Sequence, residues 1–312
     1  MKTGLNPRQI TGTPSAPWKG RRWNVKTYLW IFPALVVVSL FTIYPVIYSV
    51  DTALHRNLLT RPDQNQFVGL ENFEQILTNP AMHRSLFATL QFLSWAVIGT
   101  VVFSVLVALL LNQRFGGAKV AQVLILIPWA VPAVMAGIIW RWMFAGNVGV
   151  INGALYAVGL IDSYYSFMGD PLTAKLAVLT ARLWKDIPLA AILLLAALQL
   201  IPRDLYDAVK VDGGNIWSEF RHVTFPFLKP TLVVVMVLET MISFATFDLI
   251  FAMSGGGPAD ATTFLAWFAY KEIFVSLNLG TGAAMAFAIG ALTLVVALAY
   301  IIALRTTEIY SK

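Results

Sequence analysis

Residues 85–113 read SLFATLQFLSWAVIGTVVFSVLVALLLNQ and contain no charged side chain. A helix needs about 20 mostly apolar residues to cross the hydrocarbon core of a bilayer, so this stretch predicts a transmembrane helix. The whole chain has the same character, because 58% of its 312 residues are hydrophobic, 12% are charged and the mean hydropathy is +0.72. Soluble domains carry about 25% charged residues. The composition therefore predicts an integral membrane protein and excludes a cytosolic enzyme, a nucleic-acid binder and a disordered scaffold.

Further apolar stretches flank this one, and together they predict six transmembrane helices in an all-α membrane protein. The first stretch follows a basic tail, but it is too long for the apolar core of a signal peptide and no Ala-x-Ala site follows, so we expect it to be retained. The chain divides into a tail at 1–27, a six-helix membrane domain at 28–304 and a tail at 305–312. The expected spans are about residues 28–50, 86–111, 120–142, 176–200, 230–253 and 283–304.

Basic residues are unequally distributed between the two sides that these spans imply. The N-terminal tail has six basic residues and no acidic one, and the loops after the second and fourth spans with the C-terminal tail have eight more. The opposite loops carry Arg56, Arg61, Arg84 and Lys271. Because Lys and Arg accumulate in cytoplasmic segments, both termini are predicted to be cytoplasmic.

The sequence offers no evident catalytic or metal site. It has no cysteine, which excludes disulfides and thiolate chemistry, and its histidines, His55, His83 and His222, are far apart in sequence. It also has no Gly-Lys dipeptide, which excludes a phosphate-binding P-loop of the usual kind. If a nucleotide drives the work of this protein, another chain must bind it.

The cytoplasmic loop at 201–229, between the fourth and fifth spans, differs from the plainer loops elsewhere. Residues 204–211 have the pattern of a short amphipathic helix, with apolar side chains on one side. Gly213 and Gly214 permit a sharp turn after it, because glycine reaches positive φ without steric cost.

A second short helix is expected after this turn. Asn215 or Ser218 can cap it, it carries Trp217, and Pro226 and Pro230 are expected to end it and to start the fifth span. Apolar and aromatic side chains that point into the cytoplasm need a cover. Either the segment lies on the lipid surface, or these side chains form a docking site for a partner protein, which is the more specific hypothesis.

The loop resembles the coupling loop of ABC transporter permeases, whose pattern is E-A-A-x3-G-x9-I-x-L-P. Four positions, Asp207, Val209, Val223 and Phe225, depart conservatively from this pattern, and the spacing is intact. The matching residues are Asp207, Ala208, Val209, Gly213, Val223, Phe225 and Pro226. Upstream, residues 198–202 (LQLIP) resemble the L-Q-x-I-P lead-in of the same family.

Two further segments resemble the carbohydrate-uptake branch, which includes the maltose and glycerol-phosphate permeases. Residues 247–250 (FDLI), residues 255–258 (GGGP) and the following Thr262 and Thr263 resemble its F-D-x-I, G-G-P and Thr signature. Residues 69–73 (GLENF) resemble its first external loop. The resemblance extends from the first span to the sixth.

The resemblance implies the fold of a type I ABC importer permease and a transport subunit of a binding-protein-dependent importer for a sugar or sugar derivative. It implies as partners a second permease, expected to be a paralogue, two cytoplasmic ATP-binding subunits, an extracytoplasmic solute-binding protein and the bilayer, but no nucleic acid. ATP and Mg²⁺ would bind to the ATPase subunits, so this chain is expected to be no enzyme and to carry no cofactor, metal or catalytic residue. The expected location is the bacterial cytoplasmic (inner) membrane.

By the same resemblance, each ATPase subunit receives one coupling loop, ATP-driven closure of the ATPase pair opens the pathway outward, and hydrolysis resets it. The residues expected to couple the loop to the ATPase are Asp207, Ala208, Val209, Asp212, Gly213, Gly214, Trp217 and Phe220.

Ionisable residues inside a membrane cost about 2.5–3.5 kcal/mol at a helix centre and are functional candidates. Glu239 lies roughly 14 Å into the fifth span, near the midplane of a core about 30 Å thick, and Asp248 lies about 27 Å in, near the outer surface. Arg182 and Asp186 have the spacing of an i,i+4 ion pair, with Lys185 reaching outward. The alternative is that these side chains contact the solute.

The resemblance assigns solute contacts to the fourth and fifth spans. The expected pathway residues are Arg182, Lys185, Asp186, Leu189, Glu239, Ile242, Ser243 and Asp248. Four of these are charged where the maltose-type pattern has neutral residues, so we hypothesise a polar or anionic solute, such as a phosphorylated, sulfonated or acidic sugar, held by Arg182 and Lys185. The alternative is a neutral sugar, with these charges paired to one another or to the second permease.

Two other classes compete with this interpretation. An ion-coupled secondary transporter would use Glu239 as its ion site, but it should show inverted repeats, and no convincing repeat relates the first three spans to the last three. An integral membrane enzyme would need a cluster of nucleophile and base or of metal ligands, which the sequence does not suggest. The spacing of the loop at 201–229 argues against both.

Overall fold

The computed structural model describes residues 25–113 and 115–303, so most of the predicted tail at 1–27 and all of the tail at 305–312 lie outside the described residues. The chain divides into two compact units, residues 1–49 and 50–312, and each is described by itself. Helices dominate the described residues, as predicted, and β1 (His55–Arg56) and β2 (Gln66–Phe67) form a short antiparallel ladder.

In the first unit, α1 (Val25–Val38) continues through the π-helical segment η1 (Ser39–Ile43) into α2 (Tyr44–Ala53). This segment ends two residues before Pro45, which has no N–H to donate and whose ring clashes with the carbonyl four residues earlier in an ordinary α-helix. A wider π turn relieves that clash, so the helix continues. Residues 31–53 are long and apolar enough to cross a membrane, which agrees with the first predicted span.

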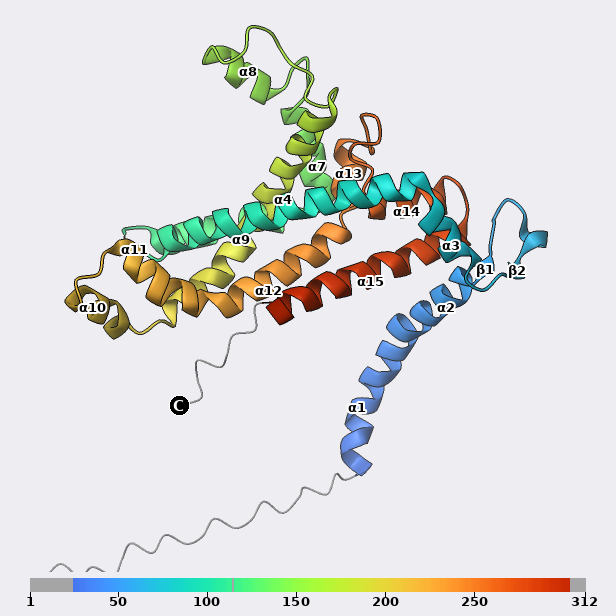
Figure 1. Cartoon of the computed structure of the whole chain (residues 1–312), viewed down its shortest axis with the longest axis horizontal. Coiled ribbons are helices and arrows are strands. Elements are labelled where there is room, and N and C mark those ends of the chain that lie inside the picture. Colours follow the sequence, from blue (N-terminus) through green and yellow to red (C-terminus); the bar gives the residue numbers. More distant parts are fainter. Residues whose placement is uncertain (1–24, 114, 304–312) are drawn as a thin grey trace, which may run out of the picture. The chain divides into compact units, whose positions relative to one another are not determined.

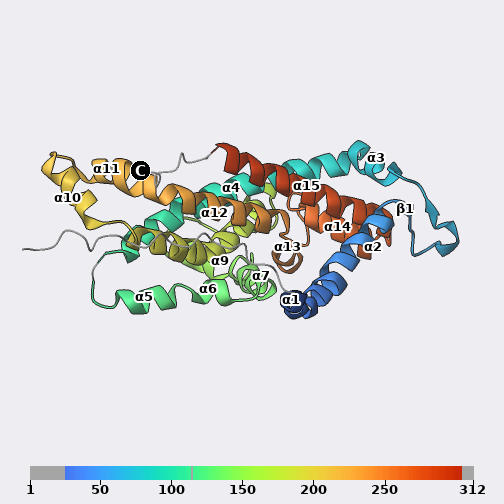
Figure 2. The same cartoon turned by 90° about the horizontal axis from the view of Figure 1, so that it is seen from below.

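Long helices make up most of the second unit, and they are α4 (Pro80–Leu111), α9 (Pro171–Gln199), α12 (Phe225–Phe244) and α15 (Leu279–Ala303). Asn79 caps α4 by accepting the N–H of Ala81, and Asp170 caps α9 by accepting the N–H groups of Leu172 and Thr173. α4 packs against α9 and α12, and α12 packs against α15 (Figures 1 and 2). Buried alanines line these contacts and let the helices approach closely.

The predicted third span is broken. α5 (Ala118–Leu124) and α6 (Ile127–Ala130) are followed by α7 (Ala133–Met143), and residues 118–130 meet α7 at an angle of 92°. Pro132 disfavours helical dihedrals in the residue before it, and Val131 has an extended ψ of 129°. The prediction of one uninterrupted helix over 120–142 is therefore wrong, because it ignored this proline.

The start of the fifth span also differs from its prediction. Pro226 and Pro230 do not separate it from the preceding short helix, because α11 (Ile216–Glu219), the π-helical segment η3 (Phe220–Thr224) and α12 follow one another without a break. η3 ends two residues before Pro226, as η1 does before Pro45, and accommodates the ring in the same way.

The fifth span ends earlier than predicted. α12 stops at Phe244, and α13 (Asp248–Met253) is a separate helix with Asp248 exposed in its first turn. The depth of about 27 Å assigned to Asp248 assumed one helix at 1.5 Å per residue up to residue 253 and is wrong for that reason. Glu239 lies in the last two turns of α12, because the helix ends at Phe244.

Within the described residues, four helices are long and apolar enough to cross a membrane, and the number rises to six if each bent pair of helices is one span. At one end of the long helices of the second unit lie α10 (Arg203–Val211) and α11, and at the other end lie α3 (Glu71–Thr78) and α14 (Leu265–Phe274) (Figures 1 and 2). The remaining described elements are the 3₁₀ turn η2 (Pro62–Gln64) and α8 (Val150–Ala157).

The segment that follows the first span meets the segment that precedes the sixth. The buried amide of Asn72 donates to the carbonyls of Ala53 and His55, at 2.8 and 2.9 Å. Leu58 forms an antiparallel bridge with Asn278, just before α15. The bridge between Leu58 and Asn278 joins the two ends of the second unit's sequence.

Candidate functional site

Three charged side chains meet between α9 and α12. Arg182 and Asp186 lie one turn apart on α9, and Glu239 lies opposite them on α12. The Nε of Arg182 forms an ion pair with Oδ2 of Asp186, its Nη2 lies 3.7 Å from Oε2 of Glu239, and its Nη1 donates to Oγ1 of Thr246 at 3.3 Å. Each of the three charged residues is at most 6% exposed.

This cluster places one cation against two carboxylates. Removing one partner of a buried ion pair costs about 3–5 kcal/mol, because it leaves an uncompensated charge, so both carboxylates depend on Arg182. The guanidinium in turn lies within ion-pair distance of Asp186 and Glu239 and donates a hydrogen bond to Thr246. Arg182 is therefore engaged within the protein.

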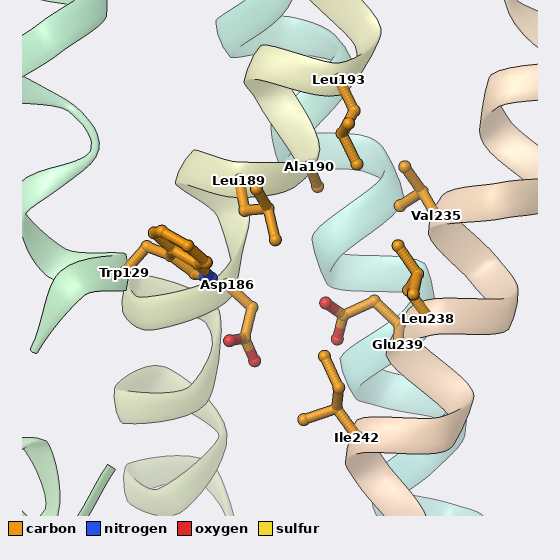
Figure 3. A pocket seen from close by; sticks show the side chains of 9 residues that line it. All are labelled: Trp129, Asp186, Leu189, Ala190, Leu193, Val235, Leu238, Glu239 and Ile242. Atoms are coloured by element: carbon orange, nitrogen blue, oxygen red, sulfur yellow. The ribbon is translucent and has the colours of Figure 1, made fainter. Parts of the chain in front are cut away.

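A narrow pocket with a cavity volume of about 20 Å³ adjoins the two carboxylates (Figure 3). Asp186 projects into it from α9 and Glu239 from α12, while Trp129, on α6, forms another wall. The other lining residues are aliphatic, namely Leu189, Ala190, Leu193, Val235, Leu238 and Ile242. The carboxylates can accept hydrogen bonds from hydroxyl groups, and the indole can pack against the apolar face of a ring.

Five of the predicted pathway residues belong to this cluster or its pocket, namely Arg182, Asp186, Leu189, Glu239 and Ile242. The other three do not line the pocket. Lys185 is half-buried and its Nζ donates to the carbonyl of Trp129 at 3.1 Å. Ser243 is buried, with no hydrogen-bond partner for its hydroxyl in the described part of the chain, and Asp248 is exposed on α13.

Trp129 is a pocket residue that the sequence reasoning missed. It lies between Pro128 and Pro132, and two prolines four residues apart in an apolar stretch are a signal for a broken helix. That signal could have located the bend in the third span. Nothing in the local sequence indicates that the indole at the bend turns toward α9.

The loop at 201–229 has the predicted helix, turn and helix. α10 ends at Val211, Gly213 has φ +77°, and the N–H of Gly214 donates to the carbonyl of Val209 at 2.8 Å. Asn215 then caps α11 by accepting the N–H of Ser218 at 3.0 Å. The predictions of a short helix over 204–211, a glycine turn and an asparagine cap are confirmed.

The tip of this loop exposes apolar side chains. Val211 is 87% exposed, Ile216 is 85% exposed and Trp217 is 65% exposed, although Trp217 stacks on Phe220 with ring centroids 5.7 Å apart. Of the predicted coupling residues, five are exposed and three are half-buried. The exposed ones are Asp207, Ala208, Asp212, Gly213 and Trp217, and the half-buried ones are Val209, Gly214 and Phe220.

The described residues contain no group of three His, Asp or Glu side chains placed to hold a metal ion. Each histidine instead has a local hydrogen bond. His55 bonds to the carbonyl of Asp51, His83 to that of Leu77 and His222 to that of Ser218.

Residues 100–306 match the family described as "Binding-protein-dependent transport system inner membrane component". The chain is 36% identical over 285 residues to the trehalose/maltose transport system permease protein MalF of Thermococcus litoralis, covering 91% of this chain and 92% of that protein. It is 33% identical over 280 residues to the sulfoquinovosyl glycerol transport system permease protein SmoG of Agrobacterium fabrum, covering 90% of each.

Solved structures share the fold. A chain of a bacterial ABC transporter involved in the import of the acidic polysaccharide alginate superposes with a TM-score of 0.77 at 20% identity, covering 91% of this chain and 96% of that one. A chain of a bacterial alginate ABC transporter in complex with a pentasaccharide-bound periplasmic protein gives a TM-score of 0.76, also at 20% identity, covering 88% and 92%.

Proposed function

The chain belongs to the binding-protein-dependent ABC transporter permeases of the carbohydrate-uptake type, and we propose that it recognises a neutral sugar through the side chains around the narrow pocket between α6, α9 and α12. As a member of this family it is a non-catalytic, multi-pass component of the inner membrane in an importer for sugars or sugar derivatives. The alternative of an ion-coupled secondary transporter with Glu239 as its ion site is set aside on the same ground.

The two basic residues beside the pocket, one buried and one half-buried, already have partners within the protein, and this decides the proposed class of solute. Arg182 is engaged by Asp186 and Glu239, and Lys185 by the carbonyl of Trp129, so neither cation faces the pocket as a free partner for an anion. The polar groups that line the pocket are the carboxylates of Asp186 and Glu239, which accept hydrogen bonds from sugar hydroxyls and repel an anionic solute. This favours a neutral sugar over the phosphorylated, sulfonated or acidic derivative.

Two relatives mark the competing solute classes. The Thermococcus litoralis relative is named for trehalose and maltose, which are neutral, and the Agrobacterium fabrum relative for sulfoquinovosyl glycerol, which is anionic. Overall identity to the two relatives is similar and does not decide between them. The charge arrangement at the pocket supports the first.

The loop at 201–229 is proposed to dock on a cytoplasmic ATPase subunit, which binds ATP and Mg²⁺. The support is its exposed tip, where Val211, Ile216 and Trp217 offer an apolar surface next to charged α10. Exposed aromatic and aliphatic residues clustered in this way are typical of interaction sites.

We further propose an assembly of this chain with a paralogous permease, two ATP-binding subunits and an extracytoplasmic binding protein, with six spans, a membrane domain at 28–304 and both termini in the cytoplasm. The placement of α10 and α11 at the end of the long helices opposite to α3 and α14 supports opposite sides of the membrane for the loop after the fourth span and the segment after the first. The assignment of the cytoplasmic side comes from the distribution of basic residues.

The test begins with affinity purification of this chain in mild detergent from its host, with identification of the proteins that co-purify. An ATPase with a P-loop and a second six-span permease are expected. The complex is then reconstituted in vesicles with its binding protein, and ATP-dependent uptake of trehalose, maltose and sulfoquinovose is measured. Uptake of a neutral sugar supports the proposal, and uptake of sulfoquinovose alone contradicts it.

A further inference from the structure

The bend in the third span leaves a backbone carbonyl without its helical partner. In a continuous helix the carbonyl of Trp129 would accept the N–H of Ala133, but α6 ends at Ala130 and Ala133 begins α7 beyond the 92° bend. The last carbonyls of any helix lack intrahelical donors. In a membrane, where water does not replace them, such groups must find a donor within the protein.

Lys185 supplies that donor. Its Nζ lies 3.1 Å from the carbonyl oxygen of Trp129, across 56 residues of sequence. A cation is favourable at the C-terminal end of a helix, where the carbonyl dipoles concentrate partial negative charge. The contact therefore satisfies two groups that are costly inside a membrane, a charged amine and an orphan carbonyl.

This contact holds a residue that faces the pocket. The carbonyl belongs to Trp129, whose indole lines the pocket beside Leu189 and Asp186 (Figure 3). Trp129 is the one aromatic residue among those that line the pocket. The backbone position of Trp129, and with it the direction of the indole, depends on how the end of α6 is held against α9.

We propose that Lys185 is a positioning residue for Trp129: its ammonium group caps the broken third span and keeps the indole against the pocket, where the indole packs on the ring of a bound sugar. The sugar contact rests on the proposed function, but the capping role does not. Lys185 thereby acts through Trp129 and makes no contact with the solute, which replaces the sequence-based hypothesis that it holds an anion.

The absence of cysteine in the chain permits a test without any solute. Leu189, one turn along α9 from Lys185, is replaced by cysteine and labelled with bimane, whose fluorescence is quenched by a tryptophan in contact with it. The variant Trp129→Phe in this background gives the fluorescence that remains without the indole at 129. The difference in bimane fluorescence between the proteins with and without the Trp129→Phe substitution shows how closely the indole approaches the pocket.

Lys185→Met is expected to abolish this difference, and Lys185→Arg, which keeps a cationic donor, is expected to preserve most of it. Retained quenching in Lys185→Met, or no change on Trp129→Phe, overturns the proposal. If Lys185→Met does not yield a monodisperse protein, Lys185→Gln replaces it, because its amide donor is shorter and should give intermediate quenching. Full quenching with glutamine would equally contradict a requirement for the charged, longer side chain.

Transport by the reconstituted complex tests the sugar contact. With trehalose or maltose as the probe, Lys185→Met is expected to raise KM about tenfold, the effect of losing one aromatic contact, with little change in kcat. In the Trp129→Phe background, Lys185→Met should raise KM almost no further, because the two residues act as a unit. A fall in kcat at unchanged KM would contradict the role. If the unmodified complex transports neither sugar, the proposed function fails, while the quenching measurement still decides the role of Lys185.

Discussion

Arg182 lies between the carboxylates of Asp186 and Glu239. The charges of these three buried side chains compensate one another only when all three are present. A buried ion pair contributes little net stability compared with apolar residues, but breaking it is costly, because the remaining charge has no water to solvate it. Removal of the arginine alone should therefore lower the free energy of unfolding far more than removal of the arginine together with neutralisation of both acids.

We expect Arg182→Met to lower the free energy of unfolding by about 3–5 kcal/mol, because it leaves two uncompensated carboxylates. Adding Asp186→Asn and Glu239→Gln should recover most of this loss. The measurement is thermal denaturation of the protein in detergent, and the midpoint temperatures of the variants are compared. Arg56→Met is the matched control, since Arg56 pairs with Glu71 in a partly exposed position and such pairs contribute about 0–1 kcal/mol. Equal losses for the two arginine variants would contradict the assignment.

At the scale of elements, the turn between α10 and α11 depends on a glycine that has no room for a side chain. A Cβ at Gly214 would lie 2.8 Å from the carbonyl oxygen of Val209 and would also meet the Val209 side chain. Both are parts of α10, so the helix and the turn cannot both keep their positions. The geometry of the loop therefore depends on this residue.

Gly214→Val is expected to leave the membrane domain folded but to abolish transport and the co-purification of the ATPase subunit, because it displaces α10 from α11. Gly116→Val provides the control. A Cβ at Gly116 meets nothing within 4 Å, and the residue lies in the loop between α4 and α5. Transport by the Gly214 variant at the control's level would show that the loop tolerates a displaced α10.

The apolar tip of the same loop gives a second prediction at this scale. Trp217→Ala should reduce the yield of co-purified ATPase by at least tenfold, which corresponds to roughly 1.4 kcal/mol or more and is typical of an aromatic residue central to an interface. Trp142→Ala on α7 is the matched control, because Trp142 is 67% exposed and Trp217 is 65% exposed. An equal effect of the two substitutions on ATPase recovery would refute docking at the tip.

At the scale of the whole molecule, the orientation in the membrane can be read from two exposed positions. Val211 follows the fourth span and is 87% exposed, and Leu160 follows α8, between the third and fourth spans, and is 72% exposed. If the termini are cytoplasmic, these positions lie on opposite sides of the membrane.

Because the chain has no cysteine, Leu160→Cys and Val211→Cys each carry a single thiol. In cells whose inner membrane is intact, a membrane-impermeant maleimide is expected to label the cysteine at 160 and to label the one at 211 only after permeabilisation. The reverse pattern would place the termini outside. Labelling of both in intact cells would contradict six spans.

Much of the architecture could be predicted from the sequence because its signals are local. An uncharged stretch long enough to cross a bilayer has few alternatives, and Gly213, Gly214 and Asn215 specify a turn and a cap through their own backbone and side-chain chemistry. Proline was harder to interpret. Pro226 lies within a continuous helix because η3 widens before it, whereas the helix breaks before Pro132. Whether a helix widens or breaks at a proline depends on the packing around it.

The sequence by itself determined a membrane protein of several spans, the helix–turn–helix loop at 201–229 and the i,i+4 spacing of Arg182 and Asp186, because composition and short-range spacing express these features directly. Only the tertiary structure decided that Arg182 also faces Glu239, on another helix, and that the neighbouring Lys185 turns to Trp129. Arg182 and Lys185 are three residues apart and point only about 60° apart on α9, so the helices packed on each side of α9, and not their spacing in the chain, decide that they have different partners. That arrangement, in which both cations are engaged and two carboxylates with an indole line the pocket, depends on packing between segments more than 50 residues apart.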